Sequence, residues 1–119
     1  MTTLLLLRHS IPERGGSSPD PGLSAEGLQR AAAVFQNDAF RTVSLVWSSP
    51  SLRALQTAQL LGLPVRQDTR LAERSTGDTT GQDASFWKRQ YEDPDFKNPD
   101  GESFREVSAR MEKIGRAHV

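Results

Sequence analysis

The 119-residue sequence contains no cysteine, only two histidines and few aromatic residues. The absence of cysteine excludes disulfide bonds and thiolate metal sites. The 15 basic residues equal the 15 acidic ones, so no excess charge favours nucleic acid or a membrane surface as a partner. No apolar run approaches the ~20 residues that cross a bilayer, and no secretory leader pattern is present. We therefore expect a cytoplasmic protein with neither nucleic-acid nor membrane partners.

Apolar patterning predicts strands that alternate with helices. Residues 3–7 are apolar without alternation, which is typical of a parallel strand covered on both faces. Further strands are predicted at residues 43–47 and 65–67. Helical spacing of apolar residues predicts helices at 24–37, 50–61, 84–91 and 103–114. This order indicates an α/β fold of three layers, with a mainly parallel sheet flanked by helices.

Local signals mark several boundaries. Ser24 is a predicted N-cap, and Gly62 is expected to end the second helix. Ser103 and Glu106 have the spacing of a capping box. The polar stretch at about 70–100 is predicted to be an insertion that forms a lid or binding loop.

Two polar segments follow the first two predicted strands. Arg8 and His9 follow the first, and residues 48–53 follow the second. The carboxyl ends of parallel strands meet at one edge of a sheet, so these segments are expected to face each other. Arginine binds phosphoryl oxygens with a planar fork, and a neutral imidazole can attack phosphorus. A carboxylic acid is then needed to protonate the leaving oxygen. Glu73 is the best-placed candidate, and its rivals are Glu13, Asp78 and Asp83.

Each of these residues also has a structural explanation. A histidine at a strand end commonly makes a structural hydrogen bond, and arginines are commonly surface residues. Arg74 is a further candidate for contacting a substrate charge. The aromatic residues of the insertion are expected to pack it down, namely Phe86, Trp87 and Tyr91.

Five motifs, in order, resemble those of the histidine phosphatase superfamily, the phosphoglycerate mutase-like family. They are LRHS (7–10), LSAEGLQ (23–29), SSPSLRALQTA (48–58), LAER (71–74) with Gly77, and GES (101–103) with Val107 and Arg110. The resemblance covers about residues 3–114. It implies that His9 is the phosphorylated nucleophile and that Arg8 and Arg53 bind the phosphoryl group, with Ser10 beside it. Glu73 would be the proton donor, the ligand a small phosphate ester, and neither metal nor organic cofactor would be used.

The sequence departs from the family pattern at several positions, one being Ile11-Pro12 in place of the frequent acidic-Thr or acidic-Ser pair. Ser10 replaces the usual glycine after the histidine, and would be strained at a positive φ. The Trp-Asn pair typical of mutases is absent. The family's second histidine, followed by glycine on a later strand, has no match, and His118 is not assigned to it. We therefore interpret residues 1–114 as a partial domain, and expect the fragment to be poorly active and marginally stable.

Three functions remain open. The first is a phosphatase that hydrolyses a phosphomonoester through a covalent phosphohistidine on His9. The second is a phosphoglycerate mutase-type phosphoryl transferase, which the missing Trp-Asn pair disfavours. The third is a non-catalytic domain that binds a phosphorylated ligand.

The last residues, IGRAHV (114–119), match the translation of ATC GGA AGA GCA CAC GTC, a stretch of a common sequencing adapter. We interpret 115–119 as a non-native or frayed tail. Sequencing the native locus is expected to show other codons after codon 114 and a continuing reading frame. The same tail followed by a stop codon at that locus would contradict this interpretation.

Overall fold

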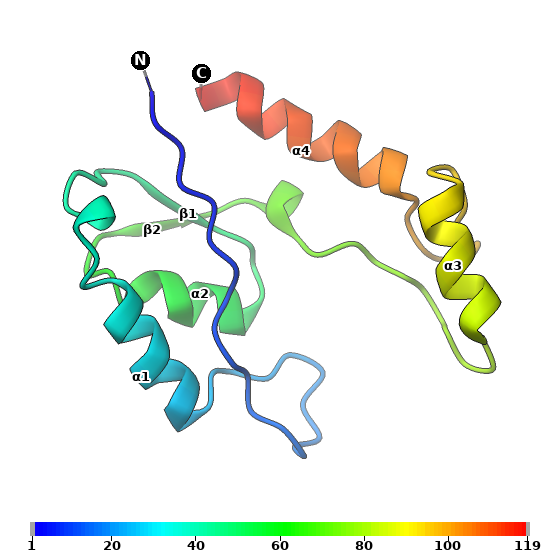
Figure 1. Ribbon diagram of the computed structural model, residues 1–119, viewed down its shortest axis with the longest axis horizontal. Helices are drawn as coiled ribbons and strands as arrows, with labels where there is room; N and C mark the ends of the chain where they lie inside the picture. The colour runs from blue at the N-terminus through cyan, green and yellow to red at the C-terminus, as the bar shows by residue number, and fades with distance from the viewer. Residues whose placement is uncertain (1, 119) are drawn as a thin grey trace. The chain divides into compact units, whose positions relative to one another are not determined.

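The computed structural model describes residues 2–118, with side chains through residue 114 (Figure 1). The chain forms two compact units, residues 3–72 and residues 73–118, the latter grouped with Thr2. No described helix is long and apolar enough to cross a membrane.

The first unit is built around a parallel strand pair. In chain order it contains α1 (Ala25–Val34), a 3-10 turn (Asp38–Phe40), β1 (Val46–Ser48), α2 (Leu52–Gln59), β2 (Val65–Gln67) and a second 3-10 turn (Thr69–Leu71). Val46 pairs with Val65 and Ser48 with Gln67, in parallel register. Parallel strands require a crossover between them, and α2 provides it. The predicted α/β class with a parallel sheet is confirmed.

Local sequence signals located the elements of this unit well. The Ser24 hydroxyl accepts a hydrogen bond from the Gly27 N–H at 3.0 Å and caps α1 as predicted. β2 has the predicted bounds, whereas β1 begins three residues later than expected and ends one residue later. Gly62 has φ of 84°, a left-handed conformation that suits glycine and stops α2 from continuing.

The prediction of a buried strand at residues 3–7 is wrong. These residues form no strand, and Leu4, Leu5, Leu6 and Leu7 are 66%, 44%, 84% and 51% exposed. Figure 1 draws this segment, in blue, without an arrow. A strand exists only through hydrogen bonds to neighbouring strands, and among the described residues β1 and β2 pair with each other in a two-stranded sheet. The apolar run therefore has the composition of a core strand without its pairing.

The second unit contains two helices, α3 (Ala84–Glu92) and α4 (Phe104–His118). α3 begins where the sequence predicted, whereas α4 begins one residue after the predicted start at 103 and ends four residues after the predicted end at 114. Asp83 caps α3 through Ser85 N at 2.9 Å, and the Ser103 hydroxyl accepts from Glu106 N at 3.1 Å. This is one half of the predicted capping box, whereas the Glu106 carboxylate pairs with Lys97.

The aromatic residues of the insertion divide into buried and exposed members. Phe86 is buried and contacts Trp87 and Phe96 edge-on, at 5.1 and 5.5 Å between ring centres. Trp87 is 44% exposed and Tyr91 82% exposed. The expectation that these residues pack the insertion is therefore confirmed for Phe86. It is wrong for Tyr91 as a buried residue, because its ring contacts Phe104 but stays mostly exposed.

Arg74 and Glu102 tie the second unit together. The Arg74 guanidinium donates to the Glu102 carbonyl at 3.0 Å and to the buried Gln90 side chain, and lies over the Phe104 ring. These contacts hold Arg74 within this unit, so we withdraw it as a candidate for a substrate charge. The Glu102 carboxylate in turn accepts from Arg110 Nε at 2.9 Å and from the Ser75 N–H at 3.0 Å.

The Arg110 and Ser75 hydrogen bonds lower the pKa of Glu102 below its ordinary value of 4.5. Because the pKa is lower in the folded chain, ionised Glu102 stabilises the fold above pH 4.5. That stability is lost as the pH falls through the folded-state pKa.

Glu102→Gln is expected to lower the free energy of unfolding by about 1 kcal/mol at pH 7, because a charge-assisted contact is lost at a partly exposed site. The difference should be smaller at an acidic pH well below 4.5, where Glu102 becomes protonated. Urea unfolding followed by Trp87 fluorescence in a Trp47→Phe background measures this unit alone. Glu92→Gln, in an exposed ion pair with Lys88, is the control and should have little effect. An equal loss at both pH values would rule out the titration of Glu102 as its cause.

Candidate active site

The imidazole of His9 is held at both ring nitrogens. Its Nδ1 lies 2.7 Å from the Ser10 carbonyl oxygen, and Arg53 Nε donates to its Nε2 at 3.2 Å. A carbonyl oxygen can only accept, so Nδ1 carries the proton. An arginine N–H can only donate, so Nε2 presents a lone pair. His9 is therefore a neutral Nδ1–H tautomer with Nε2 in the form that can act as a nucleophile.

The segments expected to meet do meet at this contact. Arg53 is the second residue of α2, and its side chain is only 19% exposed. Its guanidinium reaches His9 from the α2 side, and its Nη1 also lies 3.8 Å from a carboxylate oxygen of Asp20. The meeting of His9 and Arg53 does not depend on a strand at residues 3–7.

Arg8 is placed differently. It is exposed, and its guanidinium makes no hydrogen bond or ion pair to any residue that the structure describes. It lines a hollow of about 90 Å³ with residues of α1 and α2, including Arg30 and Thr57. The structure thus brings one of the two predicted arginines to His9, and the phosphate-binding role of Arg8 stays a prediction.

Ser10 is anchored on two sides. Its hydroxyl donates to the Gly27 carbonyl at 2.7 Å, and its N–H donates to Thr57 Oγ1 at 3.0 Å. No non-glycine residue in the described chain has a positive φ, so serine causes no backbone strain here. The hydroxyl proton of Ser10 is directed to α1, and its assignment to substrate binding stays a prediction.

A close approach of α1 fixes the chain after Ser10. The Ile11 carbonyl accepts from the Ser24 N–H at 2.9 Å and from the Ser24 hydroxyl at 3.1 Å. A Cβ on Gly27 would lie 2.2 Å from the Ile11 carbonyl oxygen, so no side chain fits at that position. Gly27 therefore sets how closely α1 can pack against the segment that carries His9.

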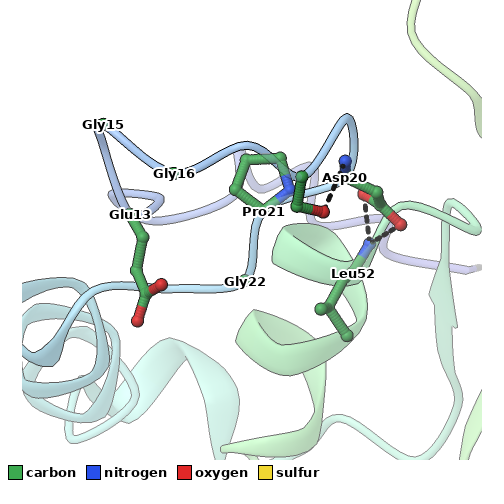
Figure 2. Close-up of a pocket in the computed structure, with 8 residues that line it drawn as sticks. Glu13, Gly15, Gly16, Asp20, Pro21, Gly22 and Leu52 are labelled. Carbon is green, nitrogen blue, oxygen red and sulfur yellow. Dashed lines mark hydrogen bonds between the residues drawn. The ribbon is translucent and has the colours of Figure 1, made fainter.

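Asp20 caps α2 although it lies far from that helix in the sequence. Ser51 occupies the N-cap position without a side-chain cap, and the Asp20 carboxylate accepts from the Leu52 N–H at 3.0 and 3.2 Å. Figure 2 shows Asp20 at the start of α2, beside a hollow of about 260 Å³ that Glu13 also lines. Sequence reasoning missed Asp20 because an aspartate between prolines is typical of any turn.

The carboxylates proposed as rivals of Glu73 differ in their hydrogen bonds. Contacts with Thr80 lower the pKa of Asp78, and contacts with Ser85 lower that of Asp83. A lowered pKa keeps both groups ionised, which is opposite to what a proton donor needs. Glu73 is the exposed first residue of the second unit, and its role as the acid stays a prediction. No cluster of three or more metal-ligating side chains occurs among the described residues.

Comparison with known proteins identifies a family. Residues 4–118 match the model of the histidine phosphatase superfamily (branch 1). The chain is 31% identical over 126 residues to mouse 6-phosphofructo-2-kinase/fructose-2,6-bisphosphatase 1, covering 94% of this chain and 27% of that protein. It is 30% identical to the "Probable phosphoglycerate mutase GpmB" of Cronobacter sakazakii, covering 93% of this chain and 60% of that one.

Solved structures match as well. A mycobacterial glucosyl-3-phosphoglycerate phosphatase in complex with inorganic phosphate has a TM-score of 0.75 and 30% identity, over 92% of this chain and 58% of that chain. The same phosphatase with VO3 has a TM-score of 0.76 and 28% identity, over 92% and 60%. The chain thus spans less than two thirds of the length of these relatives.

The capping contact of Asp20 can be tested by stability. Asp20→Ala is expected to lower the free energy of unfolding of the first unit by about 1 kcal/mol, because α2 loses its cap. Asp20→Asn keeps an acceptor and should retain most of the stability. The measurement is urea unfolding followed by Trp47 in a Trp87→Phe background. Asp38→Ala, in an exposed ion pair with Arg41, is the control, and equal losses in Asp20→Ala and Asp38→Ala would contradict the capping role.

Proposed function

Because this chain belongs to the histidine phosphatase superfamily, branch 1, we propose that it carries the nucleophile of a phosphatase. It would hydrolyse a phosphomonoester through a phosphohistidine on His9. The observation that supports this most directly is the fixed tautomer of His9, with Nδ1–H bonded to the Ser10 carbonyl and Nε2 presenting its lone pair. A neutral imidazole in this form can attack phosphorus without first losing a proton.

The proposed reaction has two steps. In the first, the Arg53 Nε–H is released from Nε2 of His9, whose lone pair forms a bond to phosphorus while the bond from phosphorus to the leaving oxygen breaks. The leaving oxygen takes a proton from Glu73, the acid that we propose. In the second, water gives a proton back to Glu73 and attacks phosphorus, the P–N bond breaks, and phosphate leaves. Nε2 regains its lone pair, so neither an oxidant nor a metal is required.

Arg53 would stabilise the transferring group. Its Nε–H reaches Nε2 in the resting chain, and once that hydrogen bond is released its N–H groups would be close to a phosphoryl group on that nitrogen. Phosphoryl transfer depends mainly on positioning and on stabilising charge on the equatorial oxygens. The fork of an arginine suits this task, and we propose that Arg8 and Ser10 assist from the segment that carries His9.

A small phosphate ester is the proposed ligand. The mycobacterial phosphatase was solved with inorganic phosphate and with VO3, an anion of similar chemistry. Its name denotes a phosphatase of glucosyl-3-phosphoglycerate, and the name of the mouse relative includes a fructose-2,6-bisphosphatase. These names support a phosphorylated metabolite as the ligand class and do not select one.

A mutase-type phosphoryl transferase is the second candidate. Similarity to the GpmB protein favours it. The sequence after Ile11 and Pro12 disfavours it, because the Trp-Asn pair typical of mutases is absent. The third candidate, a non-catalytic binding domain, is separated from the first two by whether a covalent intermediate forms. We expect the 119-residue chain to turn over slowly, since Arg53 is the one of the two predicted phosphate-binding arginines that the described structure places against His9.

Covalent labelling tests the proposed function. The chain is mixed with a ³²P-labelled phosphate monoester and denatured at alkaline pH, where a phosphohistidine survives. We expect label on the wild-type chain that is lost in acid, and no label on His9→Ala. Arg53→Lys should slow labelling about 100-fold, because lysine cannot donate the two parallel hydrogen bonds of a guanidinium to the phosphoryl oxygens.

Arg41→Lys is the matched control, since Arg41 is exposed and pairs only with Asp38 among the described residues. It should label at the wild-type rate. Label on His9→Ala, or a wild-type chain that binds vanadate but never becomes labelled, would reject the phosphohistidine mechanism. The second of these results would favour the binding domain.

A further inference from the structure

We propose that Thr57 is a positioning residue for His9. Its hydroxyl closes a ring of four hydrogen bonds that holds the imidazole in its nucleophilic tautomer. The catalytic meaning of this inference rests on the proposed function, whereas its structural part does not. Thr57 lies inside the segment 48–58, yet the sequence indicates no role for it.

The ring runs in one direction through four residues. Arg53 Nε donates to His9 Nε2 at 3.2 Å, and His9 Nδ1 donates to the Ser10 carbonyl at 2.7 Å. The Ser10 N–H then donates to Thr57 Oγ1 at 3.0 Å. Thr57 Oγ1 donates to the Arg53 carbonyl at 2.8 Å and closes the ring. Each of the four residues donates one hydrogen bond in the ring and accepts one. The direction is fixed because an arginine N–H and a backbone N–H only donate and a carbonyl only accepts.

The Thr57 hydroxyl has no freedom to reverse this polarity. It lies four residues after Arg53 on α2, where a threonine hydroxyl commonly donates to the carbonyl one turn earlier. A carbonyl only accepts, so the single hydroxyl proton points at Arg53 and the lone pairs of Oγ1 face Ser10. The side chain is 5% exposed, and water is therefore a poor substitute for this acceptor.

The consequence for His9 passes through the backbone of Ser10. Thr57 holds the peptide group that joins His9 to Ser10, and Gly27 holds the Ser10 hydroxyl. Together they fix the Ser10 carbonyl, which keeps the proton on Nδ1. The Ser10 carbonyl belongs to the next peptide group, and its direction depends on the φ and ψ of Ser10. Without the Thr57 hydroxyl the Ser10 N–H loses its acceptor, and these two angles are no longer held. The carbonyl then no longer selects the Nδ1–H tautomer, and Nε2 becomes protonated in part of the molecules.

Nitrogen NMR of the histidine ring tests this inference without any turnover. The chain has two histidines, so a ¹⁵N-histidine sample with a His118→Asn variant assigns the His9 signals. At a pH where the ring is neutral, the wild-type chain should show a protonated Nδ1 and an unprotonated Nε2. Thr57→Val, which keeps the shape and removes the hydroxyl, should add a population protonated at Nε2, and Thr57→Ser should restore the wild-type state.

Thr42→Val is the control, because Thr42 is an exposed threonine of the same unit. It should leave the tautomer unchanged. A wild-type ring protonated at Nε2 would overturn the inference at once, even if Thr57→Val fails to fold. So would a folded Thr57→Val chain with the wild-type tautomer, or a folded Thr57→Ser chain that does not restore it.

Labelling by the phosphate ester gives the second readout. Thr57→Val should slow phosphorylation of His9 on the order of tenfold at saturating ester, with little change in the concentration that half-saturates the rate. Thr57→Ser should recover most of it. A tautomer that shifts as expected in a chain that never labels would reject the proposed function and leave the positioning role standing. Normal labelling with a tautomer that does not change in Thr57→Val would reject the positioning role and leave the proposed function standing.

Discussion

The Ser10 carbonyl is the group on which the site in the first unit depends. An imidazole can be a nucleophile only while one ring nitrogen stays unprotonated, and this carbonyl fixes which one. Its own position is set from two helices, since α1 binds the Ser10 hydroxyl through Gly27 and α2 binds the Ser10 N–H through Thr57. Chain segments that are far apart in sequence thus converge on one residue, and the state of the His9 ring follows from their packing.

Close packing at two points makes this convergence possible. Gly27 allows the α1 backbone to approach the Ile11 carbonyl, where even a methyl group would overlap it. Asp20 returns from the loop before α1 to cap α2 and to lie near Arg53. The loop of residues 10–22 is therefore held at both ends, by α1 and by α2. Arg53, on the first turn of α2, is positioned together with the helix that the loop caps.

The sequence predicted features that depend on neighbours in the chain better than those that depend on distant partners. The predicted caps at Ser24 and Ser103 and the predicted strand at residues 65–67 are local in origin. Residues 3–7 failed as a strand because strand formation needs pairing that composition does not encode. The meeting of His9 with Arg53 was nevertheless predicted, although it was argued from two neighbouring strand ends, one of which does not form. Asp20 and Thr57 were missed, since an aspartate in a proline-rich loop and a threonine on an amphipathic helix have many structural uses.

The choice of proton donor can be narrowed by the same electrostatic reasoning that explains His9. A general acid must be protonated when the substrate arrives, so N–H or O–H donors that stabilise its charged form work against it. In the second unit such donors lower the pKa of Asp78, Asp83 and Glu102, and each of these carboxylates is used to fix a turn, a helix start or a helix face. Among the carboxylates that the sequence put forward, Glu73 lies in the motif that the family resemblance links to the acid, and we therefore retain it as the proposed donor.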